Sequence, residues 1–180
     1  ERPILKLGNH LIQLPWMQAM QDNRVAAINN LRRLGARRVG AREETRRIEQ
    51  RLGGLFASRG FRALVGHALP VSPEVGAQVE EIDLLCARDG CLLVLEVKST
   101  YVRRSMKDAW LHRTTTLRKA GMQLQRKVAA VRHRLASDAE LGRALGLPDG
   151  AKATVVGWIV DTSIECDRER FAGFLKLPLE

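Results

Sequence analysis

Two apolar segments joined by Arg88-Asp89-Gly90 constrain the fold of this chain more than any other feature. The segments read VEEIDLLCA and CLLVLEVK, and an Asp-Gly pair between two such runs is typical of a tight β-hairpin turn. Both segments are apolar on both faces, as is typical of central strands that helices cover on each side. The hairpin therefore predicts a sheet buried between helices.

The patterns on either side of the hairpin predict a mixed α/β domain. An amphipathic helix is expected over residues 42–59, and a short strand over 62–68 follows it. A second amphipathic helix is expected over 115–136, and the apolar run TVVGWIVDTS predicts one more buried strand. The expected order is α-β-β-β-α-β with a short tail, in a domain that spans residues 40–180.

Residues 1–39 differ in pattern from the rest of the chain. The segment LPWMQAMQDNRVAAINNLRRL carries apolar side chains at helical spacing after Pro15, which predicts a helical arm or linker. The chain begins with Glu1 rather than Met, so we expect a piece of a longer protein or a processed chain. In a longer protein, residues 1–39 would contact the other domains of the parent.

Charge, cysteine content and hydropathy indicate the surroundings of the protein. Thirty Lys and Arg against twenty Asp and Glu give a net charge of +10, which attracts polyanions, although a basic domain need not bind nucleic acid. Three cysteines without a CxxC pair favour free thiols in the reducing cytoplasm, with a Cys86–Cys91 pair across the hairpin as the alternative. No apolar run reaches about 18 residues, so no membrane span is expected, and dimerisation remains open.

Asp83 in the first strand of the hairpin and Glu96 in its second are charged residues with apolar neighbours on both sides along the chain, and Lys98 ends the second strand. Such charges require a reason, because an ion that leaves water needs a partner or a metal. Glu96 and Lys98 are two residues apart and leave the same face of a strand, which Asp83 can reach from the neighbouring strand. Paired carboxylates bind hard cations such as Mg²⁺, and an adjacent Lys can orient or deprotonate a bound water.

The stretch EIDLLCARDGCLLVLEVKS resembles the PD-(D/E)xK nuclease superfamily, especially its small resolvase-like and nuclease-related branches. Asp83 matches the first acidic position of the family, while Glu96 and Lys98 match its ExK motif. The resemblance covers about residues 40–165 and implies a restriction-endonuclease-like core, a mixed central sheet flanked by helices. It also implies a Mg²⁺-dependent deoxyribonuclease that hydrolyses phosphodiester bonds in DNA. Asp83 and Glu96 would be the metal ligands, and Mn²⁺ would be a substitute metal.

The resemblance implies a further acidic residue on the first core helix. Family members often carry a Glu there that points back into the metal site. Glu49 fits this role, because it borders the apolar stripe of the helix expected over 42–59. Glu43 and Glu44 are the alternatives on the same helix, and we expect them to be solvated.

The resemblance also implies a glutamine on the helix that follows the ExK motif. Family members often carry it in a QxxxY-like motif, and Gln123 occupies that place. Lys127 stands where the tyrosine is usual, so the match is incomplete. Gln125 lies nearer the apolar stripe and remains a rival for the role.

Basic residues follow the ExK motif along the segment 101–119, which we expect to be a loop or irregular strand at the rim of the site. Phosphate contacts there would give salt-dependent binding without sequence preference, and Trp110 would either stack on a base or pack on the core. The candidates for DNA contact are Arg103, Arg104, Lys107, Arg113, Arg118 and Lys119. Two other functions remain open: a non-catalytic nucleic-acid-binding module on the same fold, and an assembly domain of a larger machine.

Overall fold

The computed structural model of the 180-residue chain describes residues 4–13, 39–70, 79–100, 103, 105–137, 139–147 and 153–179. In the first of these ranges, β1 (Ile4–Leu7) and β2 (His10–Gln13) pair as an antiparallel hairpin. The sequence analysis did not anticipate this hairpin. The helix expected after Pro15 lies outside the described residues.

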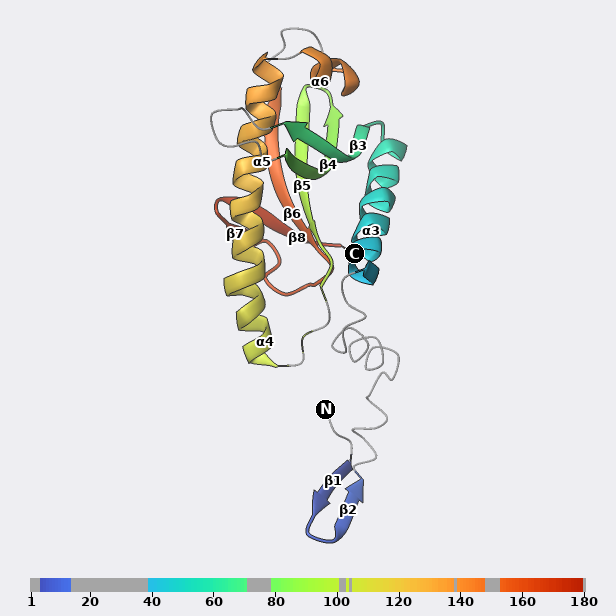
Figure 1. Ribbon diagram of the computed structural model, residues 1–180, viewed down its shortest axis with the longest axis vertical. Helices are drawn as coiled ribbons and strands as arrows, with labels where there is room; N and C mark the ends of the chain where they lie inside the picture. The colour runs from blue at the N-terminus through green and yellow to red at the C-terminus, as the bar shows by residue number, and fades with distance from the viewer. Residues whose placement is uncertain are drawn as a thin grey trace.

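The rest of the described chain is a mixed α/β body (Figure 1). Its elements are α3 (Val39–Ser58), β3 (Arg62–Pro70), β4 (Val79–Arg88), β5 (Cys91–Lys98), α4 (Met106–Leu111), η2 (His112–Leu117), α5 (Arg118–Ser137), α6 (Ala139–Ala144), β6 (Thr154–Asp161), β7 (Arg170–Phe171) and β8 (Phe174–Pro178). The predicted order from the first helix to the fourth strand is present. The helix α6 was not predicted, and the expected short tail instead forms β7 and β8.

A six-stranded mixed sheet runs through the centre of the body in the order β3-β4-β5-β6-β8-β7. Strands β3, β4 and β5 are antiparallel, whereas β6 is parallel to β5 and β8 is parallel to β6. Between β4 and β5, Asp89 and Gly90 both have positive φ, at 49° and 73°. This is the conformation that a two-residue hairpin turn requires, and it explains the Asp-Gly pair.

Helices cover the sheet on both sides, with α3 and α5 on opposite faces (Figure 1). Leu52 of α3 belongs to one apolar cluster with Leu95 of β5, and Leu124 of α5 belongs to the other with Val94. Alternate residues of β5 therefore face different helices, as the pleat of a strand requires. Glu96 and Lys98 have the parity of Val94 and face α5.

The two C-terminal strands hold α5 close to the sheet. Gly121 of α5 lies against β7, where an added Cβ would be 2.5 Å from the carbonyl oxygen of Phe171. Any side chain at Gly121 would force the helix away from this backbone. The strands that the sequence analysis took for a tail thus help to position the helix that carries Gln123 and Lys127.

The prediction of a loop or irregular strand over 101–119 is wrong for the part that the structure describes. From Met106 onward this segment is helical, as α4 and η2, and it continues directly into α5. Ser105 caps the helix, because its hydroxyl accepts a hydrogen bond from the backbone N of Asp108 at 3.0 Å. The sequence analysis weighed the many basic residues of this segment and overlooked Ser105, whose residue type is typical of the first position of a helix.

The cysteines do not form the cross-strand pair that the sequence left open. Cys86 pairs with Leu93 and Cys91 pairs with Arg88, so the two thiols are not opposite each other. All three cysteines are free. Among the described helices, none is long and apolar enough to cross a membrane.

Candidate active site

Asp83, Glu96 and Lys98 lie together on the sheet, as the sequence predicts. Leu84 pairs with Leu95, and this register brings Asp83 beside Glu96 on neighbouring strands. Asp83 Oδ2 accepts a hydrogen bond from the backbone N of Val97 at 2.7 Å. Glu96, only 1% exposed, accepts one at Oε1 from Lys98 Nζ at 2.6 Å. Two carboxylates and an ammonium group thus share one largely buried position.

A second ammonium group, that of Lys127 on α5, lies between the two carboxylates. Its Nζ donates to Asp83 Oδ1 at 2.7 Å and to Glu96 Oε2 at 2.5 Å, and Lys127 is 6% exposed. The sequence analysis treated Lys127 only as a departure from a tyrosine. A usable signal was present, because Lys127 lies three residues after Leu124 and four before Val131, within the apolar stripe of the helix.

The charges of this cluster depend on one another. Burial raises the pKa of Asp83, and the nearby charge of Glu96 raises it further, against the lowering effect of Lys127 and of the hydrogen bond from Val97. Burial by itself lowers the pKa of Lys127, but the charges of Glu96 and Asp83 outweigh that effect and raise it. Two carboxylates this close require a cation, and in this structure the Lys127 ammonium supplies it.

Glu49 approaches the same cluster from α3. Burial raises the pKa of Glu49 to about 7, and the charges of Asp83, Glu81 and Glu96 add to the shift while Lys127 opposes it. Glu49 is half-buried, and so is the alternative Glu44, whereas Glu43 is exposed. The charges of Asp83 and Glu96 act on the carboxyl group of Glu49, as its expected place beside the cluster requires.

Glu49→Gln is expected to stabilise the metal-free protein at pH 8 and to change nothing near pH 4. A carboxyl group whose pKa is raised in the folded state contributes stability below its unfolded pKa of 4.5, and loses that contribution as the pH rises through about 7. Glutamine does not ionise, so the variant escapes this loss. Thermal melts in EDTA across this pH range measure the difference. The exposed Glu43→Gln serves as control, and a pH-independent difference for Glu49→Gln would contradict the expectation.

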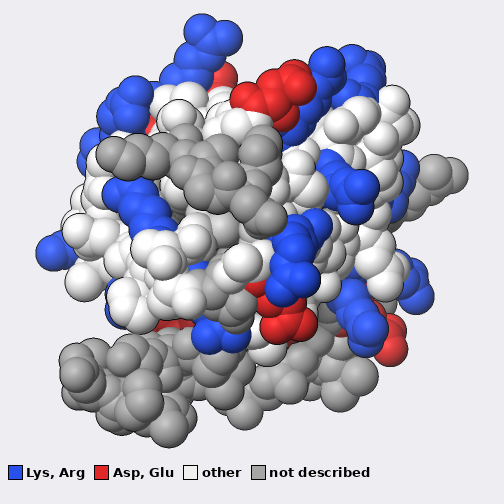
Figure 2. Space-filling view, turned by 90° about the horizontal axis from the view of Figure 1, so that it is seen from above, with Lys and Arg blue, Asp and Glu red and all other residues white. Residues whose placement is uncertain are grey.

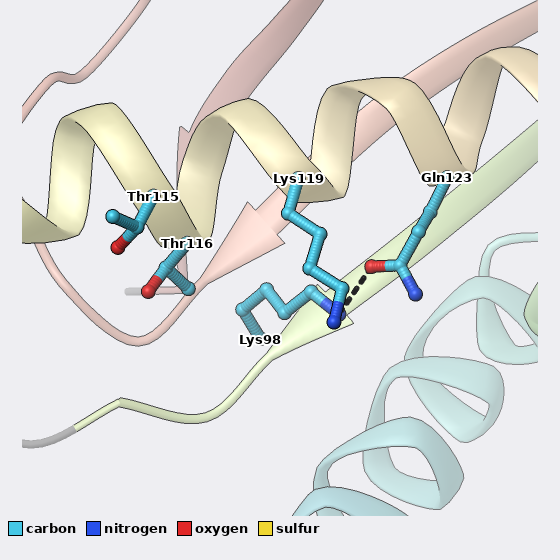
Figure 3. A pocket seen from close by; sticks show the side chains of 5 residues that line it. All are labelled: Lys98, Thr115, Thr116, Lys119 and Gln123. Atoms are coloured by element: carbon cyan, nitrogen blue, oxygen red, sulfur yellow. Dashed lines mark hydrogen bonds between the residues drawn. The ribbon is translucent and has the colours of Figure 1, made fainter.

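Gln123, the predicted glutamine, contacts the site through Lys98. Its Oε1 accepts a hydrogen bond from Lys98 Nζ at 3.3 Å, whereas the rival Gln125 is exposed. Gln123 and Lys98 also line a pocket of about 340 Å³ together with Thr115, Thr116 and Lys119. Figure 3 shows the side chains of Lys98, Lys119 and Gln123 pointing toward one another. The Thr115 hydroxyl donates to the backbone oxygen of Leu111, which leaves two ammonium groups and the Thr116 hydroxyl around one small pocket, and these favour an anion.

The predicted DNA-contacting residues do not share one environment. Arg103 forms a bidentate ion pair with Glu165, from Nε to Oε1 at 3.1 Å and from Nη2 to Oε2 at 2.8 Å, and its side chain is 3% exposed. Arg113 is exposed but pairs with Glu169 at 2.8 Å. Arg103 thus has its guanidinium group committed within the protein. Lys107, Arg118 and Lys119 are exposed, and Arg104 lies outside the described residues.

Figure 2 shows Lys and Arg side chains at several places on the end of the molecule that it views, with white surface between them. Trp110 is 61% exposed on α4, so it does not pack in the core, which was one of its two expected roles. Among the described basic residues, Lys119 is the one from the predicted DNA-contacting set that lines a pocket beside the carboxylates.

A second buried polar cluster lies next to the first, at the carboxyl ends of β5 and β6. Asp161, with no exposed surface, bonds His112 Nε2 at 2.8 Å and accepts from Thr100 Oγ1 at 2.8 Å and from Ser163. Burial alone would raise the pKa of Asp161, but these hydrogen bonds outweigh it and hold the pKa low. Lys176 Nζ donates to the backbone oxygen of Ser163.

The sequence analysis missed this Asp161 cluster. The sequence carried a signal for Asp161 similar to that for Glu96, because Asp161 is a charged residue at the end of an apolar strand. In the structure, Asp161 pairs with Lys98 on the neighbouring strand. The bond from Asp161 to His112 ties the first turn of η2 to the end of β6. The cluster therefore fixes the helix that lines the pocket against the strands that carry Glu96 and Lys98.

The carboxylates of the first cluster fit a hard divalent cation. No group of three His, Cys, Asp or Glu side chains in the described part of the chain is arranged around a common metal position. Mg²⁺, however, is often held by one or two carboxylates with water and substrate phosphate as its other ligands. Asp83 and Glu96 direct one oxygen each at a single point, which the Lys127 ammonium occupies as a stand-in cation. The carboxylate oxygens of Asp83 and Glu96 therefore fit a divalent cation, and the Lys127 ammonium lies at the position where that cation would bind.

No family model matches this chain, and no curated protein matches its sequence. The resemblance to the PD-(D/E)xK superfamily thus rests on the motif residues Asp83, Glu96 and Lys98.

Proposed function

We propose that this chain is a divalent-cation-dependent nuclease of the PD-(D/E)xK type that hydrolyses phosphodiester bonds in DNA. The observation that carries the proposal is that one oxygen each of Asp83 and Glu96 meets at a single cation position, while Lys98 bonds to the other oxygen of Glu96. The antiparallel β3-β4-β5 unit, followed by a helix and the parallel strand β6, supports a restriction-endonuclease-like core.

Each residue of the cluster has a role in this proposal. Asp83 and Glu96 would hold Mg²⁺ or Mn²⁺, with Glu49 beside them. When bound, such an ion neutralises charge on the phosphodiester and makes a bound water more acidic. Lys98 Nζ, directed by Glu96 Oε1 and Gln123 Oε1, is placed to orient the attacking water or to donate to a phosphate oxygen.

The pocket beside Lys98 supplies a place for a phosphate group of the substrate. Its lining combines the ammonium groups of Lys98 and Lys119 with the side chains of Thr115 and Thr116, which extend from η2 (Figure 3). Among the described residues, no hydrogen bond or ion pair commits Lys119 to a carboxylate, so its charge is available to a ligand. A phosphate bound there would hold the DNA backbone next to Glu96.

A cleavage assay tests the proposal. Supercoiled plasmid, linear duplex and single-stranded DNA are incubated with the full chain in Mg²⁺, Mn²⁺, Ca²⁺ or EDTA, with RNA as a parallel substrate. Cleavage in Mg²⁺ and Mn²⁺ and binding without turnover in Ca²⁺ are expected. Cleavage that persists in excess EDTA, or no cleavage of any DNA in either active metal, would refute it.

One observation favours a second function, a non-catalytic nucleic-acid-binding module on the same fold. Lys127 satisfies both carboxylates without a metal, so the site needs no divalent ion for its stability. The same assay separates the two functions. DNA binding with no turnover in any metal would favour the module over the nuclease.

Lys119→Ala is expected to weaken DNA binding and to lower the slope of log affinity against log salt by about 1, the effect of one lost phosphate contact. The physical reason is that Lys119 adds an exposed positive charge to the pocket. Fluorescence anisotropy across a salt titration measures both quantities. Lys107→Ala, an exposed lysine outside the pocket lining, is the comparison and should have a smaller effect. Equal effects for the two variants would show that the pocket has no special part in binding.

A further inference from the structure

The Lys127 ammonium occupies the position at which a divalent cation would bind. It contacts one oxygen of Asp83 and one of Glu96, at 2.7 and 2.5 Å. The other oxygen of each carboxylate is already bonded, that of Asp83 to Val97 N and that of Glu96 to Lys98 Nζ. A cation therefore cannot take both oxygens while the ammonium stays in place.

We propose that Lys127 is a tethered cation that competes with the divalent ion and sets the metal affinity of the site. The inference rests on the proposed function, since it concerns the same carboxylates. The lysine reaches the cluster from α5, whereas the carboxylates come from the sheet, so the ammonium can withdraw by a side-chain rotation without breaking a strand. The charge of Lys127 lowers the pKa of Glu49, so the ammonium and this carboxyl group interact electrostatically.

Charge balance couples this competition to the substrate. With Lys127 in place, the two charges of Asp83 and Glu96 are balanced by those of Lys127 and Lys98. A divalent ion that displaces the Lys127 ammonium adds one net positive charge to the cluster, which the single negative charge of a phosphodiester in the pocket beside Lys98 would offset. We therefore expect metal and DNA to bind cooperatively, each raising the affinity for the other by the same factor.

The test compares Mn²⁺ binding by wild type and Lys127→Met, measured on the full chain by titration calorimetry and by electron paramagnetic resonance of free Mn²⁺. Methionine has similar length and no charge, so the position is filled without a competing cation. We expect the Mn²⁺ affinity of Lys127→Met to be about tenfold or more above that of wild type. Arg126→Met, next in sequence and paired with Glu80, removes the same charge outside the cluster and should leave the affinity unchanged.

Thermal melting gives an independent readout. Without Lys127 the two carboxylates repel each other, so Lys127→Met should melt below wild type in EDTA and gain more from Mn²⁺ than wild type gains. If this variant does not fold, Lys127→Gln keeps a hydrogen-bond donor and removes the charge. A Mn²⁺ affinity equal to or below that of wild type in the folded variant would overturn the inference.

Cleavage separates this inference from the proposed function. If wild type cleaves DNA with Mg²⁺ but the Lys127 variants bind Mn²⁺ no better, the competition is refuted and the nuclease stands. If the variants bind Mn²⁺ tightly and neither they nor wild type cleaves DNA, the competition is supported and the nuclease is refuted. If no protein binds Mn²⁺ at all, with or without DNA, both are refuted.

Discussion

Lys98→Met is expected to lower the rate of Mg²⁺-supported DNA cleavage by at least about 100-fold. Lys98 is one of the two ammonium groups that bond to Glu96. It also donates a hydrogen bond to Gln123 and lines the pocket with Lys119. Methionine keeps much of its length but can neither donate to a phosphate oxygen nor orient a water. Single-turnover cleavage with saturating protein measures the rate of the chemical step, because all of the DNA is bound and a change in affinity no longer affects the rate.

The same assay shows whether the cluster acts as one unit. Glu96→Gln alone should cost about as much as Lys98→Met, and the double variant should lose little more, because residues that act together are not additive. Lys119→Met should lower affinity and leave the single-turnover rate at saturation much closer to wild type. Independent, multiplying losses for Glu96 and Lys98 would contradict a shared site.

Stability should respond less than activity to Lys98→Met. Lys98 is partly exposed, and Lys127 remains beside Glu96 in the variant. The buried carboxylate therefore keeps one cation, and a large loss of thermal stability is not expected. Should Lys98→Met unfold the domain, the residue would have a structural role and its loss of activity would carry no information.

The parts of the fold that local sequence determines were predicted correctly. The hairpin follows from two apolar runs and an Asp-Gly turn, and both residues of that turn have the positive φ that the pair favours. The same hairpin brings Asp83 beside Glu96 and Lys98, because a strand register propagates from its turn. The candidate site could thus be located from about twenty residues of sequence.

The parts that depend on packing between distant elements were not predicted. Lys127 reaches Asp83 only because α5 lies at a particular height on the sheet, which no pattern within the helix specifies. The Asp161 cluster joins the end of β6 to His112 at the start of η2 and to Thr100 after β5, which are 49 and 61 residues away in sequence. The strands β7 and β8 have two and five residues, too few for periodicity to reveal.

Asp161→Ala is expected to destabilise the protein by about 3 kcal/mol or more, because several buried polar groups lose their shared partner at once. His112, Thr100 and Ser163 all bond to this carboxylate, and Asp161 has no exposed surface. Water cannot readily replace a partner in so enclosed a position. For a chain of this size the loss corresponds to a fall in melting temperature of about 6–12 °C.

Lys176 makes the removal of Asp161 more costly. Burial lowers the pKa of Lys176, and the charge of Asp161 opposes that effect. Without the carboxylate, the folded protein must either hold a buried ammonium that has lost its largest opposing charge or release its proton. The loss of stability should therefore be larger near neutral pH, where unfolded lysine is charged, than at a pH close to the ordinary lysine pKa of 10.5.

Thermal and urea melts of matched variants measure how much the Asp161 carboxylate contributes to stability. Asp167→Ala removes an exposed carboxylate from the same loop, which pairs with Arg168 at 3.9 Å. The charge of Asp167 also opposes the lowering of the Lys176 pKa, but less than that of Asp161, so Asp167→Ala should shift the melting temperature much less than Asp161→Ala. Asp161→Asn keeps the shape and one acceptor, so it should fall between wild type and Asp161→Ala. If Asp161→Ala melts like Asp167→Ala, the Asp161 cluster does not hold η2 to the sheet. Another interaction would then have to hold η2, which lines the pocket beside Lys98, against the sheet.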